Sequence, residues 1–358
     1  MRPTNRARLT RASGAAIVLG LLFAALPAQG VVAGEDVWAW AVVRTPKHSY
    51  KVKDARDHAN SGRDVIFKRF RQGVSQVTFR GIDARLEEIS DQSGVILLTP
   101  LTSSSAICVP QSWASKPMRV GVRCYDKKGQ FIDVGFILNF LAIRSTTPTM
   151  GNVWSNLAGG TYTPRVAGNS AAQPTHIDRI SKGRSSTTWS GIGTRYGNGQ
   201  ATALIRQNVC VADLWLPASG DERIDVSCRS RGGALRHAAY SASFTAGIGL
   251  KGDGGSAWAY LVADKPGANS YTPTLDLQAS SPAITARVKR LGKGRYVAKL
   301  PGMPRGGAAQ VTPILGPGRR CNVSSIRKKS GTQRIGVRCF NAKGTKSKDA
   351  SFSLSYTR

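Results

Sequence analysis

The chain has 358 residues, with 51 Lys and Arg against 20 Asp and Glu, and a formal net charge of +31 at pH 7. This length exceeds one ordinary domain and predicts two or three. Hydrophobic residues make up 41% of the chain, which is enough to build cores and excludes wholesale disorder. Only four His are present, and this scarcity disfavours elaborate metal or acid–base chemistry.

Residues 1–33 predict an export signal. Four arginines without an acidic residue precede an apolar run from Gly14 to Ala28, and small residues follow that run. This pattern is typical of a cleaved signal peptide, because the apolar run is shorter than the roughly 20 residues of a membrane span. We therefore expect a secreted, extracellular protein, free or associated with the cell surface, that has no membrane span after cleavage.

Internal similarity organises the rest of the chain. Six cysteines fall in three pairs separated by 16, 18 and 18 positions, and the same landmarks accompany each pair. These matched offsets predict three tandem copies of one unit. We call residues 37–142 the first segment, 151–246 the second segment and 255–358 the third segment. The recurring positions are Trp38/Trp154/Trp258, Arg69/Arg179/Arg290, Gly73/Gly183/Gly294, Val122/Val226/Val337 and the aromatic pairs Phe136–Phe140, Tyr240–Phe244 and Phe352–Tyr356.

The fold class follows from period-two alternation of apolar and polar residues, which is typical of half-buried strands. In residues 295–300, Tyr296 and Leu300 alternate with Arg295 and Lys299, and residues 352–356 alternate with serine. Gly and Pro interrupt the chain every eight to twelve residues, the spacing of short strands in a sandwich. The sequence predicts an all-β protein of three tandem β-sandwich domains, Ig-like in size, of about 100 residues each. Residues 82–90 predict one short helix.

The cysteines predict structural disulfides, because an exported protein enters an oxidising environment in which paired thiols form disulfides. Fifteen pairings of six cysteines are possible, and the repeated spacing selects one pairing within each segment. Each bridge closes a loop of about 17 residues and stabilises the fold by roughly 3 kcal/mol. The spacing does not suit a metal site, since no Cys-x-x-Cys pair is present. The predicted bridges are Cys108–Cys124, Cys210–Cys228 and Cys321–Cys339.

The motif order resembles a Cys-pair and Trp repeat of secreted actinobacterial and myxobacterial proteins. The third segment carries this resemblance best, through Tyr271-Thr272-Pro273, Leu300-Pro301-Gly302 and residues 336–340, whereas the second departs most, at residues 225–229. The resemblance covers nearly all of residues 37–358. It implies a fold and a compartment, and it transfers no activity and no catalytic or binding residue.

No catalytic motif accompanies these landmarks. The four histidines do not occupy equivalent positions, and the cluster of Asp54, Asp57 and His58 is typical of a polar loop. The recurring Trp residues suit core packing, and the recurring Arg residues suit a structural hydrogen bond. We predict a non-enzymatic binding or structural protein without cofactor or metal. The alternatives are an extracellular hydrolase of wall polymers, with a site between domains where His58 or His237 meets a carboxylate, and a protease inhibitor.

Charge points to a partner. The third segment, counted from residue 251, holds 20 basic and 4 acidic residues, a net charge of +16. Such density predicts binding of an anionic polysaccharide, a teichoic acid or another polyanion. The competing interpretation is a basic surface that adheres weakly to any anionic envelope. The candidate residues are Arg287, Lys289, Arg295, Lys299, Arg319, Arg320, Arg327, Lys328, Lys329, Arg334 and Arg338.

Overall fold

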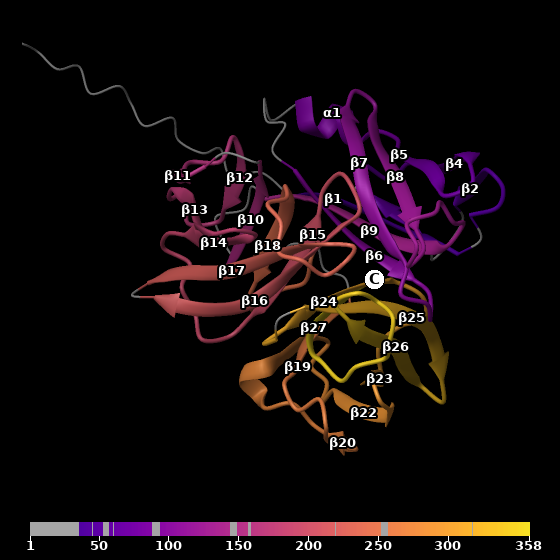
Figure 1. Ribbon diagram of the computed structural model, residues 1–358, viewed down its shortest axis with the longest axis vertical. Coiled ribbons are helices and arrows are strands. Elements are labelled where there is room, and N and C mark those ends of the chain that lie inside the picture. The colour runs from indigo at the N-terminus through magenta and orange to yellow at the C-terminus, as the bar shows by residue number, and fades with distance from the viewer. Residues whose placement is uncertain are drawn as a thin grey trace, which may run out of the picture. The chain divides into compact units, whose positions relative to one another are not determined.

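A computed structural model describes residues 36–44, 46–52, 57–59, 61–87, 94–143, 149–156, 159–218, 220–251, 257–316 and 318–358 (Figure 1). The predicted signal, residues 1–33, therefore lies outside the described residues, and its prediction stays untested. Strands make up 60% of the structure, and the described residues contain one α-helix. The predicted all-β fold class is confirmed.

The described part of the first segment holds nine strands and the helix α1 (Ile82–Glu87), which confirms the start of the helix predicted for residues 82–90. Its strands are β1 (Val37–Val43), β2 (Tyr50–Val52), β3 (Asp57–Ala59), β4 (Val65–Arg71), β5 (Val74–Phe79), β6 (Val95–Leu101), β7 (Ile107–Ser115), β8 (Met118–Tyr125) and β9 (Gly135–Ala142). They form two antiparallel layers, a four-stranded set in the order β3-β1-β9-β6 and a five-stranded sheet in the order β2-β4-β5-β8-β7.

Nine strands are also described in the second segment, outside residues 157–158 and 219, and the first of them begins at Met150, one residue before the predicted boundary. These are β10 (Met150–Ser155), β11 (Thr161–Tyr162), β12 (Val166–Asn169), β13 (Thr175–Ser181), β14 (Arg184–Trp189), β15 (Asn198–Ala203), β16 (Asn208–Ala218), β17 (Asp221–Ser230) and β18 (Tyr240–Thr245). The sheet orders are β12-β10-β18-β15 and β11-β13-β14-β17-β16. Figure 1 shows β16 and β17 as one long hairpin.

The third segment repeats this arrangement, with a short 3₁₀ helix, η2 (Leu275–Leu277), after its second strand. Its strands are β19 (Trp258–Ala263), β20 (Ser270–Tyr271), β21 (Gln278–Ser281), β22 (Arg287–Gly292), β23 (Arg295–Pro301), β24 (Ala308–Ile314), β25 (Arg319–Lys329), β26 (Thr332–Asn341) and β27 (Ser351–Thr357). The orders β21-β19-β27-β24 and β20-β22-β23-β26-β25 match the other two segments strand for strand. A parallel pairing of β25 with β6 continues the second of these orders into the strands β6-β9-β1-β3 of the first segment, which makes one nine-stranded sheet.

Each predicted disulfide is present and joins neighbouring strands of a five-stranded sheet. The bridges Cys108–Cys124, Cys210–Cys228 and Cys321–Cys339 connect cysteines that lie opposite one another in the strand register, with Cα atoms 4.1 Å apart. The predicted aromatic pairs, Phe136–Phe140, Tyr240–Phe244 and Phe352–Tyr356, are all buried. In each segment they belong to the same hydrophobic cluster as the two bridged cysteines.

The recurring Gly after each recurring Arg occupies a turn that other residues would strain. Gly73, Gly183 and Gly294 have φ angles of +64°, +71° and +64°, a region that glycine enters without steric conflict. Each glycine carbonyl accepts a hydrogen bond from the second cysteine N–H of its segment, at 2.8–2.9 Å. A side chain at Gly73 would also lie 2.7 Å from the Cys124 carbonyl oxygen. This geometry explains why the glycine recurs.

The recurring tryptophans correct a prediction. Trp38, Trp154 and Trp258 are half-buried rather than core residues. Trp154 packs edge-on against Trp113 of the first segment, with ring centroids 4.8 Å apart. Trp38 packs against two hydrophobic clusters, one centred on the third segment. Trp38 and Trp154 therefore lie at junctions between segments, where part of each ring stays accessible.

The described residues from Asp36 onward belong to one compact unit, and its interior is closed by a ring of threonines. Thr99 of β6 accepts the Val311 N–H of the third segment at 3.2 Å. Thr312 of β24 in turn accepts the Ala201 N–H of the second segment at 3.1 Å. The ring closes where Thr202 of β15 accepts the Leu98 N–H of the first segment at 3.0 Å. Each segment is thereby bonded to both others.

Backbone hydrogen bonds close a second ring, in which donation between the segments runs in the opposite direction. The N–H groups just after β6, β15 and β24 donate to carbonyls of the neighbouring segment's disulfide-bearing strand, at 2.8–3.0 Å. β15 and β24 are edge strands of their four-stranded sheets, and β6 is the last strand of the first segment's own set, where β25 of the third segment pairs with it. An uncovered edge is a site of unwanted pairing. The ring therefore covers the open edge of every segment. The pairs are Thr102–Val323, Ile205–Pro110 and Leu315–Asp213.

This closure overturns the expectation of an exposed face on β27. Ser353 and Ser355 alternate with core residues as predicted, yet both are buried, with 0% and 1% exposure. The Ser353 hydroxyl accepts a hydrogen bond from Asn198 of the second segment at 2.6 Å. The polar face of β27 meets another polar sheet face rather than water, which sequence alternation alone does not reveal.

We predict that Thr312→Val destabilises the protein by about 2 kcal/mol, because two buried groups lose their hydrogen-bond partner. One is the Ala201 N–H, and the other is the Gln200 amide oxygen, to which the Thr312 hydroxyl of the wild type donates at 2.9 Å. Thr312→Ser keeps the hydroxyl and serves as the control. Urea unfolding of both variants measures the difference. Equal stability of the Val and Ser variants would contradict a role for the ring.

Candidate functional site

The predicted basic residues of the third segment mostly occupy the outer face of its five-stranded sheet. Along β23, Tyr296, Ala298 and Leu300 are buried, whereas Arg295 is exposed and Lys299 half-buried. On β22, Arg287 and Lys289 are exposed on either side of the buried Val288. The alternation predicted from the sequence is therefore confirmed for these strands, and it directs the positive charges outward.

Four of the charges form a row across four adjacent strands, which we call the cation row. Arg287 lies opposite Lys299, and Lys299 lies opposite Arg334. Arg334 in turn lies opposite Arg327. Neighbouring strands are separated by about 4.8 Å, so the row spans roughly 15 Å. None of the four has an ion-pair partner among the described residues.

The cation row is unfavourable by itself, because like charges directly opposite one another on a sheet repel. The same register positions in the first segment hold Ile66, Thr78, Arg119 and Ala114. In the second segment they hold His176, Thr188, Arg223 and Leu216, and Arg223 pairs with Asp225 at 2.9 Å. Of the four positions, only that of Arg334 holds an arginine in all three segments, as Arg119 and Arg223. The complete row of four positive charges is therefore found in the third segment alone.

The remaining candidates flank the row. Arg295 lies opposite Arg338, and Lys289 is exposed on β22. Lys328 and Lys329 are exposed at the end of β25. Arg319 is set apart, because its guanidinium donates to the Asp349 carbonyl at 3.4 Å. Most of the predicted set therefore shares one surface.

Arg320, which was predicted to bind a polyanion, does not lie on the basic surface. Its side chain is only 3% exposed, and its guanidinium donates to the carbonyls of Ala342 and of Arg231 in the second segment. Burial, together with the nearby Arg231, lowers the pKa of Arg320 to about 10. Arg320 joins two segments and cannot meet a polymer at the surface.

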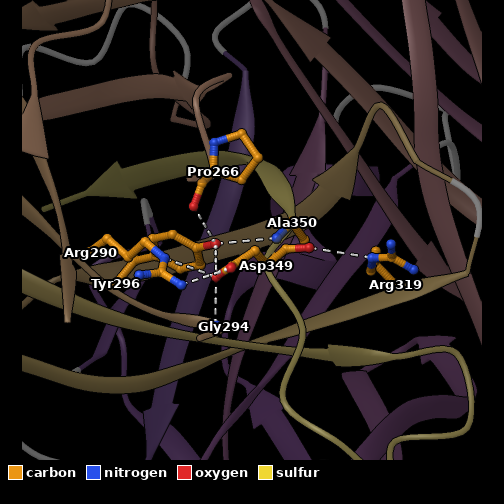
Figure 2. A network of polar contacts seen from close by, with 7 residues as sticks. All are labelled: Pro266, Arg290, Gly294, Tyr296, Arg319, Asp349 and Ala350. Carbon is orange, nitrogen blue, oxygen red and sulfur yellow. Dashed lines mark hydrogen bonds and ion pairs between the residues drawn. The ribbon is translucent and has the colours of Figure 1, made fainter. Parts of the chain in front are cut away.

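An ion pair behind the basic face holds its sheet to the following loop (Figure 2). Asp349 accepts hydrogen bonds from Arg290, at 3.1 and 2.9 Å, and from the Gly294 N–H at 2.7 Å. The Tyr296 hydroxyl lies 2.9 Å from the same carboxylate and accepts the Ala350 N–H at 3.2 Å. The predicted structural role of the recurring Arg is thereby confirmed in this segment.

The first segment has the same arrangement, with Arg69 and the Gly73 N–H both donating to Asp133. The aspartate follows the second cysteine by nine residues here and by ten in the third segment. The sequence interpretation missed it, although this repeated offset was a signal. In the second segment the position holds His237, whose Nδ1 accepts the Gly183 N–H at 3.2 Å. The Nε of Arg179 is left buried without a hydrogen bond.

His237 bears on the hydrolase hypothesis. Partial desolvation, with Arg179 and Lys182 nearby, lowers the pKa of His237 below its usual range, which favours the neutral imidazole. Its side chain has no carboxylate partner among the described residues. The side chains of Asp57 and His58, and all of Asp54, lie outside the described residues. Within the described part of the chain, no group of three His, Cys, Asp or Glu side chains is placed to hold a metal.

No protein family, curated protein or solved structure matches the chain. Within the described residues there is also no helix with the length and apolar character that a membrane crossing requires.

We predict that Asp349→Asn destabilises the protein by about 2 kcal/mol at pH 7. Hydrogen bonds from Arg290, Gly294 and Tyr296 lower the pKa of Asp349 to about 2, below its usual value near 3.8. A depressed carboxyl pKa contributes stability above the unfolded-state pKa, and this contribution is lost as pH falls from about 4 to 2. The gap between wild type and variant should close over that range in thermal unfolding. Asp276→Asn, at an exposed position, is the control; a gap independent of pH would contradict the assignment.

We predict that His237→Asp stabilises the second segment by about 1 kcal/mol at pH 7, because it supplies the carboxylate that Arg179 lacks. The reciprocal change, Asp133→His, should destabilise the first segment, since Arg69 loses its ion pair. Urea unfolding of both variants compares them directly. A destabilising His237→Asp would show that the two sites are not equivalent.

Proposed function

We propose that the protein is an exported, tandem-repeat, non-enzymatic protein that binds polyanionic polymers of the cell wall or extracellular matrix through the third segment. The single observation that carries the proposal is the cation row of Arg287, Lys299, Arg334 and Arg327. Four unpaired positive charges in register are unfavourable alone, and a polymer with repeated negative charges relieves their repulsion.

The flanking charges extend this surface. Arg295 and Lys289 lie on the two strands that begin the row, and Lys329 lies two residues beyond Arg327 on the same face. Lys328 lies opposite the buried Gln333 and therefore on the other face. Lys and Arg side chains on a broad sheet face suit a flexible polymer better than a small ligand, since no pocket is needed. The three disulfides are compatible with an extracellular location.

Aromatic stacking does not contribute to the proposed face. Tyr296, the aromatic residue between the charged positions of β23, is buried in the core, so bases of a nucleic acid have no ring to stack on there. The proposal therefore rests on charge alone and favours anionic polysaccharides and teichoic acids.

The test uses the full-length protein and immobilised heparin or a poly(glycerol phosphate) teichoic acid. The quadruple variant Arg287→Gln, Lys299→Gln, Arg327→Gln, Arg334→Gln should bind more weakly. Each lost contact removes about 0.7 to 0.9 from the slope of log K against log salt, so the slope should become shallower by about 3.

The matched control removes four exposed charges from the other segments, through Arg63→Gln, Arg165→Gln, Lys182→Gln and Arg195→Gln. It has the same net charge as the quadruple variant. If both variants lose the same affinity and slope, total charge rather than the cation row determines binding, and the proposed site is wrong.

A further inference from the structure

A second concentration of positive charge lies where the first and second segments meet. A cleft of ≈ 580 Å³ opens there, and its lining includes four arginines and no carboxylate. Arg123 comes from β8, Arg206 from the loop between β15 and β16, and Arg231 and Arg236 from the turn and loop after β17. We call it the arginine cleft. It shares no residue with the cation row.

One wall of the arginine cleft is fixed by hydrogen bonds. The Arg231 guanidinium donates to the Lys127 carbonyl of the first segment at 2.8 Å, and the Arg231 carbonyl accepts from Arg320 of the third. Gln207 donates to the Gly129 carbonyl at 3.2 Å. Residues of all three segments thus hold Arg231 in place, and a ligand would meet a preformed surface.

The other three arginines have no such role. Arg123, Arg206 and Arg236 make no side-chain hydrogen bond and no ion pair within the described part of the chain. Arg123 is half-buried, whereas Arg206 and Arg236 are exposed. Guanidinium groups that converge without a counter-charge are available to an incoming anion.

Arg206 lines the arginine cleft with its backbone in an unfavourable conformation. Ile205 and Arg206 have φ angles of +56° and +61°, a region that residues with side chains rarely adopt. The corresponding loop of the third segment has Leu315 at +48°, and Gly316 follows it. The second segment therefore places an arginine where glycine would be accommodated more easily, and that arginine lines the cleft.

The equivalent opening between the second and third segments has a different chemistry. A cleft of ≈ 420 Å³ there includes Asp213 and Asp225 in its lining. Asp213 follows its cysteine by three residues, as Gln111 of the arginine cleft does, and Gly316 stands where Arg206 stands. The second cleft thus does not share the lining of four arginines without a carboxylate, which the common strand order alone does not produce.

We propose that the arginine cleft binds a compact multivalent phosphate, with the size and charge of a triphosphate. Guanidinium forks match the oxygens of phosphate groups with paired hydrogen bonds, and a cleft of this volume accommodates a small ligand. Gln111 and Asn208 supply further polar contacts, and the lining offers few apolar surfaces for a hydrophobic ligand. This site is independent of the polymer-binding face.

The test is calorimetric titration of the full-length protein with inorganic tripolyphosphate. We expect one saturable site per chain, and binding of orthophosphate at least about tenfold weaker, because a single phosphate cannot meet all four arginines. Arg206→Gln with Arg236→Gln should weaken tripolyphosphate binding by at least about tenfold. Arg165→Gln with Arg195→Gln removes equal charge elsewhere and should change it by less than about twofold.

The quadruple variant of the cation row separates this inference from the proposed function, since it should keep tripolyphosphate binding while losing polymer binding. Absence of a saturable site, equal affinity for orthophosphate, or equal loss in the Arg165 and Arg195 control would each overturn the inference.

Arg206→Gly gives a readout that a merely structural arginine would not produce. Glycine adopts a φ of +61° without strain, so this variant should raise Tm by about 1–2 °C, while it weakens tripolyphosphate binding as the glutamine variant does. A variant with lower Tm and unchanged affinity would show that Arg206 serves the fold and not a ligand.

Discussion

The threonine hydroxyls of β6, β15 and β24 determine how the three segments can be arranged. Each hydroxyl accepts a backbone N–H from the edge strand of the next segment, and the three bonds return to their starting point. A chain of two segments would leave two edges uncovered, whereas three close on themselves. The buried serines of β27, the shared hydrophobic clusters and the position of Arg320 all depend on this closure.

Within that common frame, the segments differ where water or a partner can reach them. The strand order is the same three times, yet the carboxylate that pairs with the recurring arginine is a histidine in the second segment. Charge gathers in a row in the third segment and around a cleft between the first and second. A shared fold thus supports separate sites whose chemistry is set by a few substitutions.

Local features of the sequence predicted local features of the fold. Period-two alternation located the strands, the repeated cysteine spacing identified all three bridges, and Arg290 proved to be structural as expected. Alternation reports only which residues share a face, so it could not tell whether the serine face of β27 meets water or another sheet. The same limit placed Arg320 on the surface and hid the arginine cleft, whose residues come from different segments.

The sequence predicted part of the cation row. Alternation put Arg287 and Lys299 on one face of two adjacent strands, but the register that sets Lys299 beside Arg334 joins strands separated by a long stretch of chain. No turn and no disulfide connects these two strands, so their register is set by which face of each strand is buried in the core. Once the register is known, the counterparts in the other segments serve as internal references for every substitution.

The ring also dictates the order in which the chain can reach its final state. The partner of Thr99 is Val311, 212 residues later in the chain, so the first segment must wait for synthesis of the third before its edge is covered. Contacts of such long sequence separation form slowly, because the loop between them must first be ordered. Until then β6 presents an open edge to any neighbouring chain. The yield of folded protein therefore depends on whether the ring closes within one molecule before the edge of β6 pairs with a second molecule.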